Sequence, residues 1–210
     1  MKFPAKVVLA TTLALLATGC AAVNKVTEEV EHQSSEYGNE IKAVDLENLI
    51  GTIKITGGDR LVVKRALTQQ TTRRSHAALT PDGDTLRLMG GCSGAAGECD
   101  VDWDITLPKD VKVKVANKTG GITLSGVSAP EIDVRTKLGE ITVAATGGFD
   151  RLSAHSEGGE VTVTVPGDRA YQVTTKVRER LGKADVQVRQ GPGPGIAASS
   201  DRGGVTVRNA

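Results

Sequence analysis

Two glutamates at matching places in a repeated motif are the residues of this sequence best suited to chemistry. Glu140 and Glu160 each follow a glycine and precede a strand-like segment, in GEITV at 139–143 and GEVTV at 159–163. If the repeats stack ~5 Å apart, the two carboxylates lie close enough to hold a cation between them. The same pattern also fits two solvated charges on a corner. Since no nucleophile, base or aromatic partner accompanies the pair, we expect no catalytic residue and no cofactor.

A cysteine near the N-terminus is the second chemical candidate. Residues 1–19 have a basic start and an apolar run over 7–17, which is too short to span a bilayer and typical of a signal peptide. The run ends in LATGC at 16–20 and resembles a bacterial lipobox. The resemblance implies a lipid on Cys20, which would anchor the protein to the extracytoplasmic face of the cell membrane. The alternative is an ordinary signal peptide in which Cys20 is incidental.

Two further cysteines flank a short glycine-rich loop. Cys92 and Cys99 enclose SGAAGE, and the export signal upstream favours an oxidising compartment. A metal or redox pair would favour Cys-x-x-Cys spacing, which this segment lacks. We therefore predict a structural disulfide between Cys92 and Cys99.

A repeat with a period near 20 residues positions these candidates. The segments GGITL at 120–124, GEITV at 139–143, GEVTV at 159–163 and GGVTV at 203–207 share one pattern, and the last step is about twice the others. Shorter strand signals fall between them, as at 132–134 and 152–154. Such a period indicates units that bury their apolar faces only against their neighbours. We predict an all-β, single-domain β-solenoid of β-helix type with rungs of ~20 residues. The final strand would form an exposed edge.

The middle residue of each repeated strand is a threonine that should face water. Alternation places Thr123, Thr142, Thr162 and Thr206 opposite the core-facing residues on either side of them. In stacked rungs equivalent residues lie one above another, so these threonines would form a surface ladder. The aromatic Trp103 has the parity of Val101 and Ile105 and should pack inward.

The remaining sequence defines the domain boundaries. Residues 20–39 are polar and acidic, and we expect a flexible tether after the lipidated cysteine; a short helix with Val23, Val26 and Val30 on one face is the alternative. Residues 40–210 would form the solenoid, in which Leu61–Val63 would start a new half-rung. With 26 basic and 25 acidic residues, and 2% aromatic residues, the chain lacks the charge pattern of a nucleic-acid-binding protein.

Several segments together resemble the bacterial DUF4097 family of adhesin-like proteins, particularly actinobacterial lipoproteins. They are VDWDITLP after Cys99, NKTGGITLSG at 117–126, PGDRAYQV at 166–173 and IAASSDRGGVTVRN at 196–209. The resemblance covers residues 40–210. It implies an exported or membrane-associated β-solenoid and supplies no catalytic residues.

The sequence therefore predicts a membrane-anchored exported lipoprotein of adhesin or scaffold type, without catalysis. Its expected partners are the membrane, through Cys20, and an envelope protein or glycan. The alternative is a carbohydrate-active enzyme or glycan-binding protein of parallel β-helix type, with an acidic groove lined by Trp103 or Tyr171.

Overall fold

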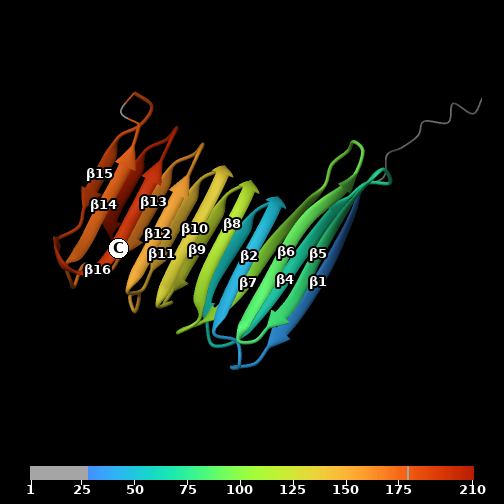
Figure 1. Ribbon diagram of the computed structural model, residues 1–210, viewed down its shortest axis with the longest axis horizontal. Coiled ribbons are helices and arrows are strands. Elements are labelled where there is room, and N and C mark those ends of the chain that lie inside the picture. Colours follow the sequence, from blue (N-terminus) through green and yellow to red (C-terminus); the bar gives the residue numbers. More distant parts are fainter. Residues whose placement is uncertain (1–27, 179) are drawn as a thin grey trace, which may run out of the picture.

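The computed structural model describes residues 28–178 and 180–210, which form two β-sheets packed face to face (Figure 1). The predicted signal peptide, residues 1–19, and the predicted lipidation site Cys20 lie outside the described residues. Within the described part, no helix has the length and apolar character needed to cross a membrane.

Seventeen strands make up the part of the fold that the structure describes. They are β1 Glu29–Tyr37, β2 Ala43–Ile50, β3 Ile53–Gly58, β4 Leu61–Gln69, β5 Arg73–Asp82, β6 Thr85–Gly94, β7 Asp100–Pro108, β8 Lys112–Thr119, β9 Ile122–Val127, β10 Glu131–Leu138, β11 Ile141–Ala145, β12 Arg151–Ser156, β13 Val161–Val165, β14 Tyr171–Val177, β15 Ala184–Gln187, β16 Gln190–Ser200 and β17 Val205–Asn209.

The strands divide into two sheets, named here sheet A and sheet B. Sheet A has nine strands in the order β1-β4-β7-β3-β9-β11-β13-β17-β15. Sheet B has eight, in the order β14-β16-β12-β10-β8-β2-β6-β5. The inner faces of both sheets carry alternate Val, Ile and Leu side chains, which form one continuous core along the stack. This alternation buries one side of each strand and leaves the other in water.

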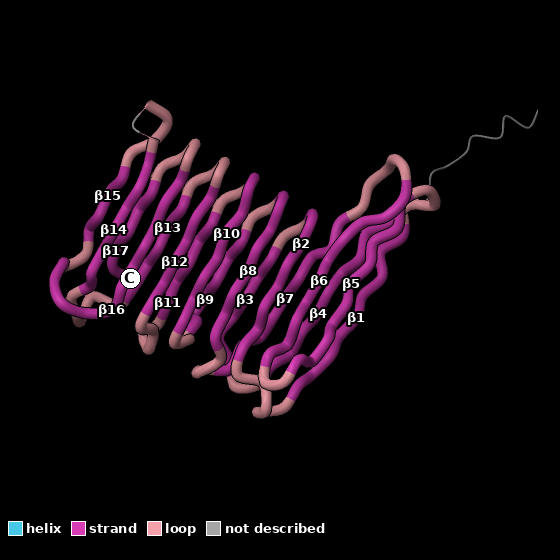
Figure 2. The backbone as a smooth tube through the Cα atoms, in the orientation of Figure 1, coloured by secondary structure: helices cyan, strands magenta, loops and turns pink. Residues whose placement is uncertain are grey.

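Seven rungs of the stack each contain one strand of sheet B followed by one strand of sheet A. These rungs are β2/β3, β6/β7, β8/β9, β10/β11, β12/β13, β14/β15 and β16/β17. Neighbouring rungs pair in parallel, with Ile141 opposite both Ile122 and Val161, and Val161 opposite Val205. The predicted all-β solenoid with rungs of about 20 residues is confirmed, and Figure 2 shows the strands running side by side along the stack.

The rungs do not stack in chain order. The rung β16/β17 lies between β12/β13 and β14/β15, so Val161 pairs with Val205 although 44 residues separate them. The prediction that the final strand forms the exposed edge is therefore wrong. The edges at that end of the stack are β14 and β15. The chain forms the rung β14/β15 first, and the later rung β16/β17 then lies between it and β12/β13.

The N-terminal part is an antiparallel extension of the same two sheets. Strand β1 pairs with β4 over residues 29–37, so the predicted flexible tether over 20–39 is wrong for these residues. The predicted half-rung at Leu61–Val63 is also wrong, because β4 lies in sheet A with β3 and is separated from it by β7. The turn after Asp82 joins β5 and β6 in an antiparallel hairpin.

Candidate functional site

A row of buried polar side chains fixes how the rungs stack. Five residues occupy the same place on neighbouring strands of sheet B and are each at most 6% exposed: Asn48, Asn117, Thr136, Ser156 and Ser200. Asn117 Nδ2 donates to the carbonyl oxygen of Gly51 at 2.8 Å, and Ser156 Oγ to that of Gly139 at 2.8 Å. Buried polar groups require partners, so this row favours one register between the sheets.

The glycines at the corner beside this row leave no space for a side chain. A Cβ atom on Gly139 would lie 2.2 Å from the carbonyl oxygen of Gly120, and one on Gly159 would lie 2.0 Å from that of Gly139. Gly203 repeats the arrangement one rung further on. The rungs can therefore approach to hydrogen-bonding distance at this corner only because glycine occupies these positions. The glycine corner and the buried polar row together set the spacing of the residues on the outer faces of the two sheets.

The predicted threonines lie in register on the outer face of sheet A. Thr123, Thr142, Thr162 and Thr206 occupy the adjacent strands β9, β11, β13 and β17, each directly opposite the next. Two residues further along, this face carries Ser125, Ala144 and Thr164. We call this area the hydroxyl face. The side chains of the threonine row are short and uncharged, and the second row ends at Arg208 on β17, whose Nε donates to Thr164 Oγ1 at 3.5 Å. Lys54 on β3 and Asp185 on β15 border the threonine row.

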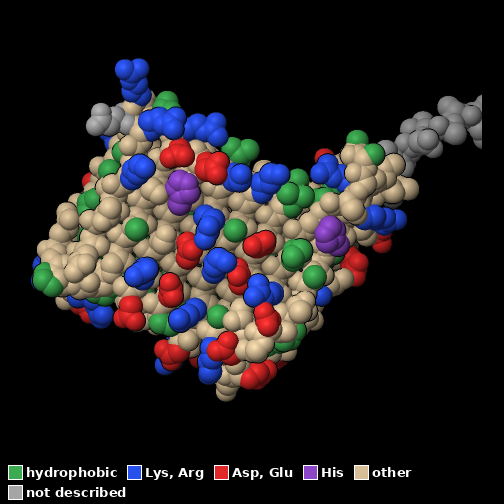
Figure 3. Space-filling view, viewed as in Figure 1, with side chains coloured by type: hydrophobic (Ala, Val, Ile, Leu, Met, Phe, Trp, Pro, Cys, Tyr) green, Lys and Arg blue, Asp and Glu red, His purple; other side chains and the backbone are tan. Residues whose placement is uncertain are grey.

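The outer face of sheet B has a different character, because basic and acidic side chains alternate across its strands (Figure 3). Lys114 Nζ lies 2.9 Å from Asp45 Oδ2, and Lys137 Nζ lies 4.0 Å from Glu157 Oε1. Since most of these side chains are largely exposed, each pair contributes only about 0–1 kcal/mol to stability. The two outer faces therefore offer a partner different surfaces, one of hydroxyl groups and one of mixed charge.

His155 lies on the charged face and contacts a serine on the next strand. Its Nδ1 is 2.9 Å from Ser199 Oγ, and the two residues are in register on β12 and β16. Its sequence neighbour Ser156 points the other way, with Oγ bonded to the Gly139 carbonyl oxygen. The histidine therefore belongs to a cross-strand polar pair, beside a shallow hollow that Ala116 and Lys118 also line.

The two candidate metal ligands share a hollow with two cations. Glu140 and Glu160 lie at equivalent corner positions of successive rungs and are both exposed. Lys183 and Arg202 line the same shallow hollow. Among residues 28–178 and 180–210, no cluster of three His, Cys, Asp or Glu side chains with metal-binding geometry occurs. The hollow is therefore lined by two carboxylates and two cationic side chains.

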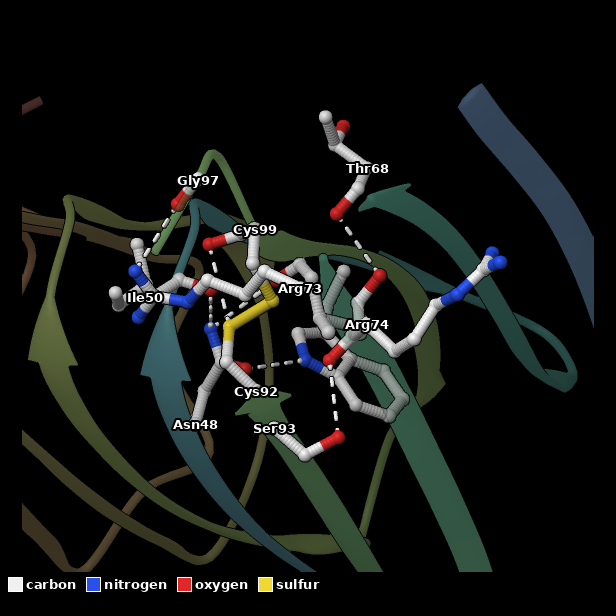
Figure 4. Close-up of a disulfide and its surroundings, with 12 residues drawn as sticks. Asn48, Ile50, Thr68, Arg73, Arg74, Cys92, Ser93, Gly97 and Cys99 are labelled. Atoms are coloured by element: carbon white, nitrogen blue, oxygen red, sulfur yellow. Dashed lines mark hydrogen bonds between the residues drawn. A yellow bond between two sulfur atoms is a disulfide. The ribbon is translucent and has the colours of Figure 1, made fainter. Parts of the chain in front are cut away.

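Cys92 and Cys99 form a disulfide between the end of β6 and the start of β7 (Figure 4). Their Cα atoms are 6.1 Å apart, and closing this short loop stabilises the fold by about 2–3 kcal/mol in the chain-entropy treatment. Asn48 lies near the disulfide, and its Oδ1 accepts a hydrogen bond of 3.1 Å from Trp103 Nε1. Trp103 is 1% exposed and packs inward as predicted; Tyr171 is fully buried, so neither aromatic ring lines an open groove.

Four described groups have perturbed acidities: Asp100, Asp168, Tyr171 and Arg169, whose own pKa is raised by its hydrogen bond to Asp168. Burial raises the pKa of Asp100, beside the disulfide, and Asp102 and Glu98 add to the effect while Thr68 opposes it. Arg169 lowers the pKa of its neighbour Asp168 by a hydrogen bond. Burial raises the pKa of Tyr171, whose hydroxyl donates to the Pro166 carbonyl oxygen at 2.8 Å. These shifts arise from local packing at separate places in the fold.

Sequence reasoning missed the buried polar row, although the sequence carries a signal for it. In each strand of sheet B concerned, two apolar inward positions are followed two residues later by Asn, Thr or Ser, as in Val113, Val115 and Asn117. The alternation alone predicts the last position to be inward. Its polar side chain becomes intelligible only once the glycine carbonyl groups opposite it are located.

Comparison with known proteins agrees with this architecture. No curated protein matches the chain by sequence. A solved structure described as a "putative cell adhesion protein" from Clostridium sporogenes is similar over 87% of this chain and 100% of its own, with 13% identity and a TM-score of 0.65. A "putative adhesin" from Bacteroides fragilis aligns over 87% of this chain and 97% of its own, with 13% identity and a TM-score of 0.36.

One segment of the chain matches a protein-family model. Residues 97–190 match the model of the family described as Toastrack DUF4097. They run from the disulfide loop through the regular rungs to the terminal rung β14/β15, and so include the glycine corner and much of the buried polar row. The predicted resemblance to the DUF4097 family is confirmed over this segment.

Proposed function

We propose that the protein is an exported, lipid-anchored adhesion module that contacts partners through the hydroxyl face and performs no catalysis. Cys20 would carry the lipid and hold the domain at the extracytoplasmic face of the cell membrane. The names given to proteins of similar fold support the adhesion role, and LATGC at 16–20 supports the anchor.

The observation that carries the proposal is the in-register row of Thr206, Thr162, Thr142 and Thr123 on a rigid parallel sheet. Each hydroxyl group can donate and accept a hydrogen bond, and the strands space the rows at ~4.8 Å. Glycines and buried hydrogen bonds hold this spacing, so a partner meets the groups already in position. Such preorganisation lowers the entropic cost of binding. A glycan or a protein surface of the envelope fits this chemistry.

Binding to isolated cell envelopes tests the contact surface. We expect saturable binding that weakens at least about tenfold in the Thr142→Lys, Thr162→Lys double variant, because two long charged side chains would stand in the uncharged threonine row. Ser153→Lys, Ala197→Lys is the matched control, since these residues are outward neighbours on β12 and β16 of sheet B. Equal binding by both double variants would refute the role of the hydroxyl face.

Cell fractionation tests the anchor separately. We expect the wild-type chain in the membrane fraction and the Cys20→Ala variant in the soluble extracytoplasmic fraction, because the variant cannot be acylated at this site. A variant that stays fully membrane-bound would show that Cys20 is not the anchor. The result leaves the envelope-binding assay unaffected.

A further inference from the structure

Within residues 28–178 and 180–210, both ends of the stack are open. Strands β1 and β5 form the free edges at one end, and β14 and β15 form them at the other (Figures 1 and 2). A free edge presents unpaired backbone N–H and C=O groups. Six apolar side chains pack against the core but stay partly exposed: Tyr37, Ala77, Leu79, Val173, Val177 and Val186. All six belong to these four terminal strands, so incomplete burial of the core is concentrated at the two ends.

The two ends carry opposite charge. Residues 28–41, which include β1, contain five glutamates and no lysine or arginine, and β5 at the same end adds Arg73, Arg74 and Asp82, so acidic residues outnumber basic ones by six to two. Residues 171–190, which include β14 and β15, contain five basic and two acidic residues. Glu29 and Glu36 lie 3.6 Å from Arg74 and 2.7 Å from Arg60, but these are exposed pairs that leave the segment acidic. Like ends therefore repel each other, and unlike ends attract.

Strand direction also permits unlike ends to meet. Strand β1 is antiparallel to β4, and β4 is antiparallel to β7, which is parallel to β3 and to the rest of sheet A. Strands β1 and β15 therefore run in the same direction at opposite edges of sheet A. A second copy placed end to end by translation along the stack would add its β1 to β15 as a further parallel strand. Its β5 would meet β14 at the edge of sheet B.

We propose that the partner at these ends is a second copy of this chain, docked head to tail. The contact extends both sheets, covers the partly exposed apolar side chains and pairs the acidic end with the basic one. Such a heterologous contact uses two different surfaces and can add copies without closing. The proposal does not depend on what the hydroxyl face binds, since stacking leaves both outer faces open.

Sedimentation velocity on the full-length chain carrying Cys20→Ala tests the proposal without the lipid. At low salt we expect the weight-average sedimentation coefficient to rise with protein concentration. Raising ionic strength from about 0.05 to 0.5 M should weaken association about tenfold, because the Debye length falls from about 14 to 4 Å. A monomer at every concentration, or association that salt strengthens, would overturn the proposal.

Paired charge reversals test the head-to-tail arrangement directly. The Lys176→Glu, Lys183→Glu variant makes the basic end acidic, and the Glu28→Lys, Glu29→Lys, Glu31→Lys variant makes the acidic end basic. Each alone should remain monomeric, and an equimolar mixture should associate again because unlike ends meet once more. A mixture that stays monomeric while the wild type associates would refute this geometry.

A matched control separates charge at the ends from charge in general. Lys118→Glu, Arg151→Glu makes the same change of charge as Lys176→Glu, Lys183→Glu, but on the internal strands β8 and β12, where both side chains are exposed. This variant should associate like the wild type. Unchanged thermal unfolding in all variants confirms that each still folds; association lost equally in the control would contradict the assignment to the ends.

Discussion

Replacing Gly159 by alanine isolates the contribution of the glycine corner. The added Cβ would lie 2.0 Å from the carbonyl oxygen of Gly139, whereas an ordinary contact needs at least 3.4 Å. The rungs would have to separate locally by about 1 Å, beyond the reach of a hydrogen bond. The bond from Ser156 Oγ to Gly139 O, at 2.8 Å, and that from Ile141 N to the Glu160 carbonyl oxygen, at 2.9 Å, lie within this region.

The expected loss follows from these two bonds. Each contributes about 1 kcal/mol, and a buried carbonyl left without a partner adds about 1–3 kcal/mol. We therefore expect Gly159→Ala to lower the free energy of unfolding by about 2–5 kcal/mol. For a domain of this size that corresponds to a fall in Tm of roughly 5–15 °C. Guanidinium unfolding followed by circular dichroism and differential scanning calorimetry measure the two quantities.

Gly204→Ala is the control for this experiment. Gly204 occupies the corner position that Glu160 occupies one rung away, and its Cβ would lie 3.4 Å from the Lys183 carbonyl oxygen. An alanine there makes an ordinary contact, so we expect a change within about 0.5 kcal/mol. Equal losses in both variants, or a loss below about 0.5 kcal/mol for Gly159→Ala, would refute the close-approach argument.

Two further substitutions test the buried polar row and the perturbed aspartate. Asn48→Ala removes the side-chain partner of Trp103 Nε1 and of the Val101 carbonyl oxygen. We therefore expect the free energy of unfolding to fall by about 2–4 kcal/mol and the fluorescence of the single tryptophan to shift to the red. An unchanged spectrum and an unchanged stability would contradict this expectation. Burial raises the pKa of Asp100, so the folded protein loses stability as pH rises from the unfolded value of 3.8 through the raised one. Asp100→Asn should therefore gain Tm over the wild type at pH about 7 and lose this advantage near pH 3, whereas a pH-independent difference would exclude the titration.

The sequence predicted the rung but not the order of the rungs. The period of 19–20 residues between Ile122, Ile141 and Val161 determined the strand pairing, because identical alternation can bury its apolar side only against a neighbour in register. The step of 44 residues to Val205 also signalled an extra rung. The rung β14/β15 lies beyond β16/β17 because of contacts between residues far apart in the chain, and the local alternation of apolar residues does not predict such contacts.

The strand formed by the acidic segment before residue 40 also could not be predicted from the local sequence pattern. Residues 29–37 lack the apolar alternation of a core strand, and only pairing with β4 makes them a strand. An edge strand with one neighbour needs few buried side chains, so composition alone gave no signal for it.

The sequence by itself determined the all-β class, the inward and outward residues, the threonine row and the cysteine pair, because each depends on alternation or on short spacing. The tertiary structure alone decided which ends of the stack are open and which strands form the edges. It also placed the glycine carbonyl groups opposite Asn, Thr and Ser, and brought Lys183 and Arg202 beside Glu140 and Glu160. These features join residues far apart in the chain, and only folding specifies such contacts.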